Sequence, residues 1–263
     1  METESEPISL SALEFDVLWE HLKPGTMPLV VKVPSPGRTY EERAQIEEQV
    51  WEGLGQRGLG RQIDVHPEIE HLFGVLAHPE REVDGRVWVG SDVRLLACSV
   101  GSEAVLAVLS GERITVKRVS PESLASSVVG VLPAWQAGPG QSVTLRTADF
   151  EAAAKSADGT RKSFEANMLG RGIRADDALA LSEMIGDVQG TGNFGAAARD
   201  RLGRRKRADR VVSFFDTSDG RYVQVRRPSP DGTFWTTISP ADQRRLTHHV
   251  DEILGDIVRD TEI

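Results

Sequence analysis

Two segments of the chain have residue types and spacings that could bind phosphate. The first, Gly190-Thr-Gly-Asn-Phe-Gly195, matches the pattern G-x-G-x-x-G, in which backbone N–H groups approach a pyrophosphate. The pattern works when it follows a strand and opens a helix, but the dozen residues before Gly190 have the apolar period of a helix. The nearby strand-like runs are antiparallel in character. We therefore expect residues 190–195 to form a glycine-rich loop rather than a dinucleotide site.

The second segment is a basic run. Residues Arg199 to Arg210 include seven arginines and lysines, which could neutralise phosphates. However, no aromatic residue is interleaved to stack on bases, and the formal net charge of −9 would repel nucleic acid. We expect a solvated, mobile loop here, and a dock for an acidic partner segment remains open. A nucleotide- or nucleic-acid-binding protein that uses Gly190–Gly195 and Arg199–Arg210 is the alternative functional hypothesis.

No other group of residues predicts a reaction centre. The histidines lack a metal signature such as H-E-x-x-H and a cysteine pair; they stand at positions 21, 66, 71, 78, 248 and 249. No G-x-S-x-G nucleophile motif is present. Cys98 is the single cysteine, and its apolar surroundings predict a small buried residue rather than a reactive thiol. We expect no enzymatic activity, no cofactor and no metal.

The composition is that of a soluble globular protein, with 39% apolar and 27% charged residues. No apolar run approaches the ~20 residues needed to cross a bilayer. The acidic start of the sequence lacks the basic and apolar regions of a secretory signal. These features predict a cytoplasmic protein without membrane insertion.

Local patterns predict an alternation of helices and short strands. Ser11 with Glu14, and Thr39 with Glu42, form capping boxes that open two helices, and an apolar stripe from Ile69 to Leu76 predicts a third. The predicted strands are Pro28–Pro34, Val83–Val89, Val93–Val100, Ala104–Leu109, Arg113–Val119, Ser142–Arg146, Val211–Phe215, Tyr222–Arg226 and Thr233–Ile238. A further helix is expected at Ala175–Val188. The short turns between most of these strands favour antiparallel meanders.

The chain also carries an internal repeat. The segment Ile114–Leu124 returns as Phe234–Arg244, each with a β-rich run, a Ser-Pro pair and an amphipathic stretch. Ser120 and Ser239 are the predicted helix N-caps, with proline at the first helical position. Two strand–strand–strand–helix units predict a quasi-two-fold molecule. We expect one domain over 1–263, with an N-terminal half at 1–132, a connection at 133–161 and a C-terminal half at 162–263.

Five short motifs occur in the order found in a known family: Leu13-Glu-Phe-x-x-Leu-Trp19, Arg57-Gly-Leu59, Ala104-Val-Leu-Ala-Val-Leu109, Gly192-Asn-Phe-Gly195 and Phe215-Asp-Thr-x-x-Gly-Arg-Tyr222. On these motifs the chain resembles the ESX (type VII) secretion-associated EspG proteins. The resemblance implies an α+β fold, with a central antiparallel β-sheet flanked by two helical bundles in quasi-two-fold symmetry. It also implies a cytosolic, cofactor-free chaperone and specificity adaptor. Such a protein would bind the helical tip of PE/PPE-type substrates, keep them soluble and mark them for export.

In that family the partner contacts come from a loop between early strands and from the C-terminal helical bundle. Carried over to this sequence, the resemblance implies partner-binding residues Trp88, Gly90, Ser91, Asp92, Leu181, Met184, Ile185, Gly192 and Phe194. Core packing is an alternative for Trp88 and for Met184. The loop Gly90–Asp92 is shorter than in some members. Two alternatives stay open: the cargo could be another helical type VII secretion substrate, and an exposed sheet edge could support a homodimer.

Overall fold

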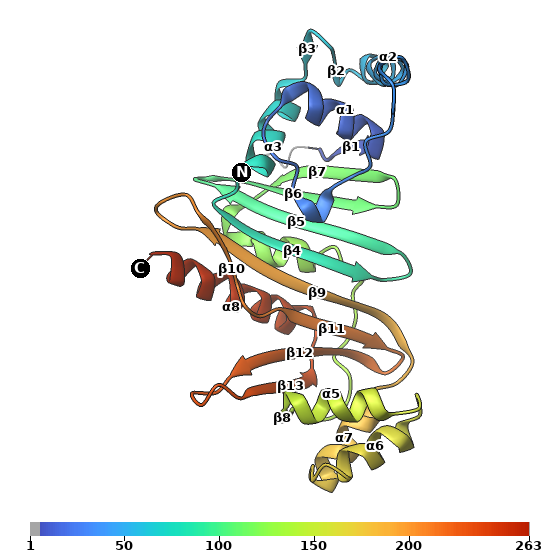
Figure 1. The fold of residues 1–263 in the computed structure, drawn as a ribbon, viewed down its shortest axis with the longest axis vertical. Helices are drawn as coiled ribbons and strands as arrows, with labels where there is room; N and C mark the ends of the chain where they lie inside the picture. Colours follow the sequence, from blue (N-terminus) through green and yellow to red (C-terminus); the bar gives the residue numbers. More distant parts are fainter. Residues whose placement is uncertain (1–5, 263) are drawn as a thin grey trace.

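The computed structural model describes residues 6–262, and one antiparallel sheet of eleven strands forms the centre of these residues. The strand order is β1-β7-β6-β5-β4-β9-β11-β12-β13-β8, with β10 paired to β9 (Figure 1). The strands are β1 (Ile8–Ser11), β4 (Arg81–Trp88), β5 (Asp92–Val100), β6 (Glu103–Ser110), β7 (Arg113–Val119), β8 (Val143–Arg146), β9 (Val188–Arg199), β10 (Arg205–Arg207), β11 (Val212–Thr217), β12 (Gly220–Pro228) and β13 (Phe234–Pro240). A separate pair consists of β2 (Gly60–Arg61) and β3 (Asp64–Val65).

The predicted meanders are confirmed. Strands β4 to β7 pair in chain order, and glycines with positive φ stand in the turns between them: Gly90, Gly101 and Gly111. In the second half, β11, β12 and β13 pair in the same way. In the first half, β4, β5, β6 and β7 follow one another in the sheet, and the chain then enters α4. In the second half, β9, β11, β12 and β13 do the same on the other side of the β4–β9 pair, and the chain then enters α8. This order agrees with the quasi-two-fold repeat, which stays a prediction.

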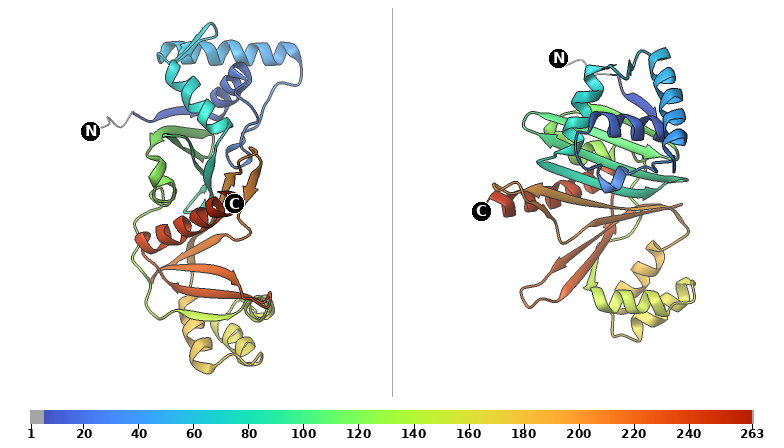
Figure 2. Two further views of the ribbon diagram at one scale, coloured as in Figure 1. Left: turned by 90° about the vertical axis from the view of Figure 1, so that its left-hand side faces the viewer. Right: turned by 45° about the horizontal axis from the view of Figure 1, so that its top comes forward.

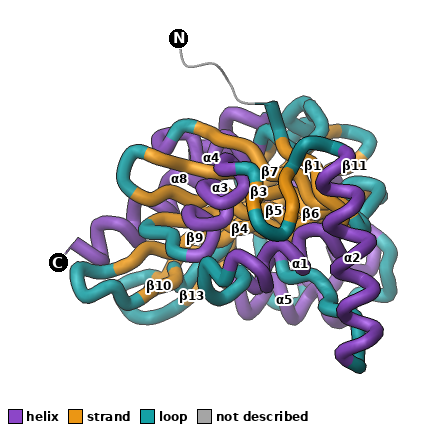
Figure 3. The backbone as a smooth tube through the Cα atoms, turned by 90° about the horizontal axis from the view of Figure 1, so that it is seen from above, coloured by secondary structure: helices purple, strands orange, loops and turns teal. Residues whose placement is uncertain are grey.

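An N-terminal helical bundle covers β5, β6 and β7 on one face of the sheet. It contains α1 (Ala12–Leu22), α2 (Tyr40–Gln56) and α3 (Pro67–Ala77), and α2 extends beyond the neighbouring elements (Figure 3). Both predicted capping boxes are present, at Ser11 and Thr39. The buried apolar side chains beneath the bundle include Phe15, Phe73 and Leu96. The segment predicted as a strand between Pro28 and Pro34 instead contains the short 3₁₀ helix η1 (Leu29–Val31), which packs against β5.

A C-terminal helical bundle lies at the other end of the molecule and covers β8, β12 and β13 on the same face (Figure 1). It contains α5 (Thr147–Ser156), α6 (Arg161–Leu169) and α7 (Ala175–Met184). Helices α5 and α6 are not among the elements predicted from the sequence. Their apolar stripes are short, and α6 carries Arg161 rather than an acidic residue in its first turn. The region expected to be a connection therefore contains β8 and α5 as well as irregular chain.

Helices α4 (Leu124–Val129) and α8 (Gln243–Glu262) cover the opposite face, across β4, β5, β9 and β11 (Figure 2). Leu246, Val250, Ile253 and Ile257 of α8 lie on one buried stripe, because their spacing repeats with the helical turn. The sheet separates this core from the face that carries the two helical bundles, on which Arg86 and Trp88 lie. No described helix is long and apolar enough to cross a membrane.

The predicted N-cap at Ser239 is wrong, and the one at Ser120 has the predicted position but not the predicted hydrogen bond. Ser239 is buried in β13, and α8 begins four residues later, where Arg245 N donates to Asp242 Oδ1 over 2.8 Å. Ser120 precedes the 3₁₀ helix η2 (Pro121–Ser123), and its hydroxyl donates to the Glu122 carboxylate instead of accepting from a backbone N–H. Both Ser-Pro pairs therefore mark the end of a strand. In the second pair, Ser239 and Pro240 still pair with β12, so the helix can begin only after them.

The prediction of a glycine-rich loop at Gly190–Gly195 is also wrong. This segment belongs to β9, a central strand that pairs with both β4 and β11. Its glycines permit close packing: a Cβ built on Gly192 would lie 2.5 Å from Val87 Cγ1, and one on Gly195 would lie 2.2 Å from Arg207 Nη2. An antiparallel strand at this position does not form the strand-to-helix turn on which the nucleotide-binding hypothesis depends.

The basic run is a hairpin rather than the expected mobile loop. Strand β10 folds back on β9, and its arginines pair with acidic side chains of β4. Arg205 Nε donates to Glu82 Oε1 over 2.8 Å, and Arg207 Nη1 lies 2.6 Å from Asp84 Oδ1. Arg204 pairs with Asp200 in the hairpin turn. These pairs neutralise much of the charge that the nucleic-acid hypothesis required.

Candidate partner-binding surface

The tip of the β4–β5 hairpin carries an exposed indole. Trp88 ends β4 with 44% of its surface exposed. The turn is closed by Val89 N, which donates to Ser91 O over 3.1 Å. Gly90 occupies the left-handed region (φ +85°), a Cβ built on it would have no neighbouring atom within 4 Å, and Asp92 is also exposed. The backbone thus projects a large amphipathic side chain at the end of the sheet.

A row of side chains runs from this indole across the sheet. Trp88 stands opposite Thr191, Thr191 opposite Phe215, and Phe215 opposite Tyr222. Residues directly opposite each other in antiparallel strands point to the same face, so the row continues beneath the C-terminal bundle. The rings of Phe215 and Tyr222 stack with centroids 5.2 Å apart. Burial, followed by the nearby charge of Asp219, raises the pKa of the Tyr222 phenol.

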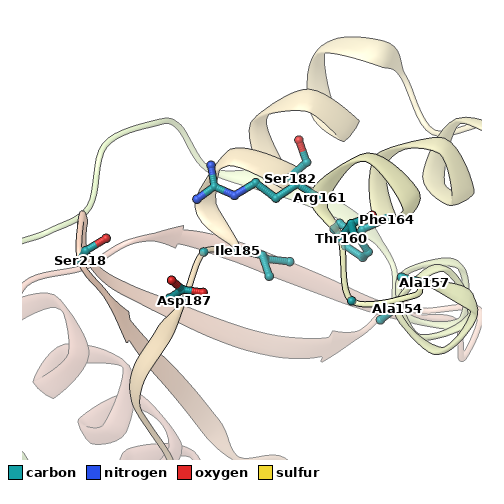
Figure 4. Close-up of a pocket in the computed structure, with 11 residues that line it drawn as sticks. Ala154, Ala157, Thr160, Arg161, Phe164, Ser182, Ile185, Asp187 and Ser218 are labelled. Carbon is teal, nitrogen blue, oxygen red and sulfur yellow. The ribbon is translucent and has the colours of Figure 1, made fainter.

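The C-terminal bundle contains a cavity of about 480 Å³ at this end of the molecule. It lies between the end of α5, the start of α6, the end of α7 and the β11–β12 turn (Figure 4). Phe164 and Ile185 supply apolar walls, and Ser218 and Asp187 supply polar groups. The guanidinium of Arg161 lies close over Gly186, where an added Cβ would be 2.9 Å from Nη2. Apolar walls with a polar rim suit a side chain of another polypeptide.

The structure places the predicted partner-binding residues in three different environments. Trp88 and Gly90 to Asp92 lie at the hairpin tip, and the half-buried Ile185 lines the cavity on the same face. Leu181 and Met184 are buried inside the C-terminal bundle. Phe194 is fully buried on the opposite face, and the missing side chain of Gly192 makes room there for Phe214. A role of any of these residues in partner binding stays a prediction.

Sequence reasoning did not identify four residues of this surface. Arg161, Phe164 and Ser218 line the cavity, and Val188 stands beside it with 47% of its surface exposed. The Thr160 hydroxyl, which accepts from Ser163 N over 3.2 Å, is an N-cap that could have predicted the start of α6. No local sequence pattern relates Ser218 to α6. The two are far apart in sequence, and only the folded sheet brings the β11–β12 turn to the cavity beside α6.

The fold defines a class of protein: an α+β scaffold in which a wide antiparallel sheet carries an exposed hairpin tip and two helical bundles. The family model described as EspG family matches residues 11–252, and the chain belongs to this family. The resemblance predicted from the sequence motifs is confirmed.

Two known proteins extend the comparison. The chain is 22% identical over 194 residues to the ESX-1 secretion-associated protein EspG1 of Mycobacterium marinum (strain ATCC BAA-535 / M). That alignment covers 72% of this chain and 66% of the relative, so the match spans just under two thirds of that protein. Among solved structures, the fold is similar to the Mycobacterium tuberculosis type VII secretion system chaperone EspG5, solved in complex with a PE25-PPE41 dimer. The TM-score is 0.70 at 19% identity, with 95% of this chain and 96% of that chain covered. The predicted fold class is thereby confirmed.

Proposed function

We propose that this chain is a cytoplasmic, non-enzymatic chaperone and specificity adaptor for PE/PPE-type substrates of a type VII (ESX) secretion system. It binds the helical tip of the substrate, keeps the substrate soluble and marks it for export. The observation that supports this most directly is an exposed tryptophan on the sheet face that also carries the C-terminal bundle and its cavity, on the fold of a chaperone solved with a PE25-PPE41 dimer.

The physical basis is the burial of apolar surface that would otherwise make the substrate associate with itself. Trp88 offers an anchor of the kind that dominates binding energy when a partner excludes water around it. The cavity of about 480 Å³ accepts a few side chains from a helix tip. The rim groups Arg161, Asp187 and Ser218 provide orientation through hydrogen bonds.

Co-expression with PE/PPE pairs encoded in the same genome tests this function. We expect a stable soluble complex that co-purifies through affinity and size-exclusion steps. Trp88→Ala is expected to weaken the complex by about thirtyfold or more, because the loss of a buried aromatic anchor costs about 2 kcal/mol or more.

Tyr40→Ala is the matched control. Tyr40 begins α2 with 94% of its surface exposed, far along the chain from the hairpin tip, and its loss should leave affinity unchanged. Equal losses in both variants, or a failure of all such pairs to form a complex, would contradict the proposal.

A further inference from the structure

The two helical bundles leave the middle of their shared sheet face uncovered. The N-terminal bundle packs on β5 to β7, and the C-terminal bundle packs on β8, β12 and β13. Figure 1 looks onto the strands between them, β4, β9 and β11. On these strands Arg86, Thr191 and Asn193 are exposed, although they belong to central strands of the sheet. Central strands are usually covered, so this strip is available for a partner.

Along this face of β4 the side chains change from acidic, at Glu82 and Asp84, to basic, at Arg86. Glu82 and Asp84, earlier on the same face, are paired with Arg205 and Arg207 of β10. The next residue on that face, Arg86, has no acidic partner among the described residues. It stands directly opposite Arg94 of β5, whose Nη1 donates to Lys32 O over 3.1 Å and which likewise has no acidic partner among residues 6–262. Like charges directly opposite in a sheet are destabilising, and their Cα atoms are about 4.5–5.5 Å apart.

The row continues on the other side of Arg86 with a polar side chain. Asn193 of β9 stands opposite Arg86, and Ser213 of β11 stands opposite Asn193. The Ser213 hydroxyl donates to Asn193 Oδ1 over 2.6 Å, and the amide N–H groups of Asn193 have no acceptor among the described residues. Two guanidinium groups and one amide thus present hydrogen-bond donors in one line. From Arg94 on β5 to Asn193 on β9 the line spans two strand spacings, about 10 Å at about 4.8 Å each.

We propose that the row Arg94, Arg86 and Asn193 is a docking site for an acidic peptide segment of a partner protein. Carboxylates would accept from both guanidinium groups and would relieve their mutual repulsion, and Arg–carboxylate pairs are short and directional. A segment of about three extended residues covers the length of the row. Trp88 lies two residues beyond Arg86 on the same face, so the occupant would lie beside the exposed indole. Nucleic acid is disfavoured because the whole chain has a net charge of −9.

Fluorescence anisotropy with a labelled, capped octaglutamate peptide and the full chain tests the site. We expect saturable binding that weakens as salt is raised, because the contacts are between ions. Arg86→Glu should weaken binding at least tenfold. The same change should raise the thermal midpoint, because it places a carboxylate opposite Arg94 and so replaces a like-charged cross-strand pair with an oppositely charged one.

The paired readout separates lost binding from lost folding. Arg171→Glu, an equal charge change at an exposed position after α6, is the control and should alter peptide binding by less than about twofold. The proposal is overturned if wild type does not bind the peptide or if both variants weaken it equally. It is also overturned if Arg86→Glu lowers the thermal midpoint, or if an oligothymidylate binds the row as well as the peptide does.

Discussion

Gly138 and Tyr222 approach each other more closely than any side chain at position 138 would allow. A Cβ on Gly138 would lie 2.2 Å from Tyr222 Cζ, well inside van der Waals contact. The Tyr222 hydroxyl donates to Pro139 O over 3.1 Å and so fixes the ring against this part of the chain. Gly220 is constrained as well, with φ +147° and the backbone of Gly138 only 2.4 Å from a built Cβ. Two glycines and a tyrosine therefore form one packed unit.

Gly138→Ala is expected to lower the free energy of unfolding by about 1–3 kcal/mol, the usual cost of overpacking. Gly53→Ala is the matched control, because Gly53 lies inside α2 with no atom within 4 Å of a built Cβ. That change should raise stability by about 0.5–1 kcal/mol, as alanine favours a helix over glycine. Urea denaturation measures both values. A neutral Gly138→Ala variant would show that the contact with Tyr222 is looser than described.

Individual residues were predictable where one local pattern decides their environment. Cys98 is fully buried, as predicted, and its Sγ donates to Val75 O over 3.7 Å. Burial, followed by the charge of Glu82, raises the pKa of its thiol. The alternation along β4 also indicates that Arg86 and Trp88 share a face opposite Val87. Which of the two faces is covered depends on distant helices, so the exposure of Trp88 could not be read from its own strand.

At the scale of elements, the motif Phe215-Asp-Thr-x-x-Gly-Arg-Tyr222 holds the connection between the halves. Trp135 Nε1 donates to Thr217 O over 3.1 Å, and Arg221 exchanges backbone hydrogen bonds with Gln136 and Gly138. Beneath them, the buried guanidinium of Arg221 pairs with Asp216 through contacts of 2.6 and 2.8 Å. The same guanidinium donates to Pro133 O over 3.2 Å. These contacts fasten the connection to the β11–β12 hairpin.

Asp216→Asn is expected to destabilise the protein by about 3–5 kcal/mol, because it leaves the buried Arg221 charge without its counter-ion. Glu151→Gln is the matched comparison. It breaks the exposed pair with Arg226, whose ions are 2.7 Å apart, and should cost no more than about 1 kcal/mol. Chemical denaturation distinguishes the two, and equal small losses would contradict a structural role for the buried pair.

Most strands and the first three helices could be predicted because turn glycines, capping boxes and apolar periods all lie within a few residues of each element. Strand β9 could not be, because Gly- and Ala-rich residues have low strand propensity and its pairing comes from β4 and β11. The start of α8 was misplaced for a related reason, since strand pairing overrides the local cap signal at Ser239. The ion pairs of β10 with β4 join residues far apart in sequence, and no local pattern indicates them.

At the scale of the whole molecule, the two halves meet within one sheet. Strand β4 pairs with β9 along its full length, from Arg81 opposite Ala198 to Trp88 opposite Thr191. The core on the α4–α8 face contains buried side chains from both halves. Neither half could separate without exposing this core and two unpaired strand edges. The single domain over 1–263, with halves 1–132 and 162–263 and the connection 133–161, stays a prediction, which the shared sheet and core support.

A single cooperative unfolding transition is therefore expected in differential scanning calorimetry, with the calorimetric enthalpy equal to the van 't Hoff enthalpy. The separate segment 1–132 should be unstable, because β4 would lose its partner β9 and α4 would lose α8. Two resolved transitions, or a folded 1–132 fragment, would show that the halves are independent.

Hydrogen–deuterium exchange of the chain, with and without a co-purified PE/PPE pair, shows where the partner binds. We expect the partner to slow exchange at the hairpin tip, residues 86–92, and from the end of α7 into β9, residues 185–191. Exchange in α2, residues 40–56, should not change, because this helix lies in the other bundle. Slowed exchange confined to the N-terminal bundle, with no change at Trp88 or along the cavity, would contradict partner binding at the hairpin tip and the C-terminal bundle.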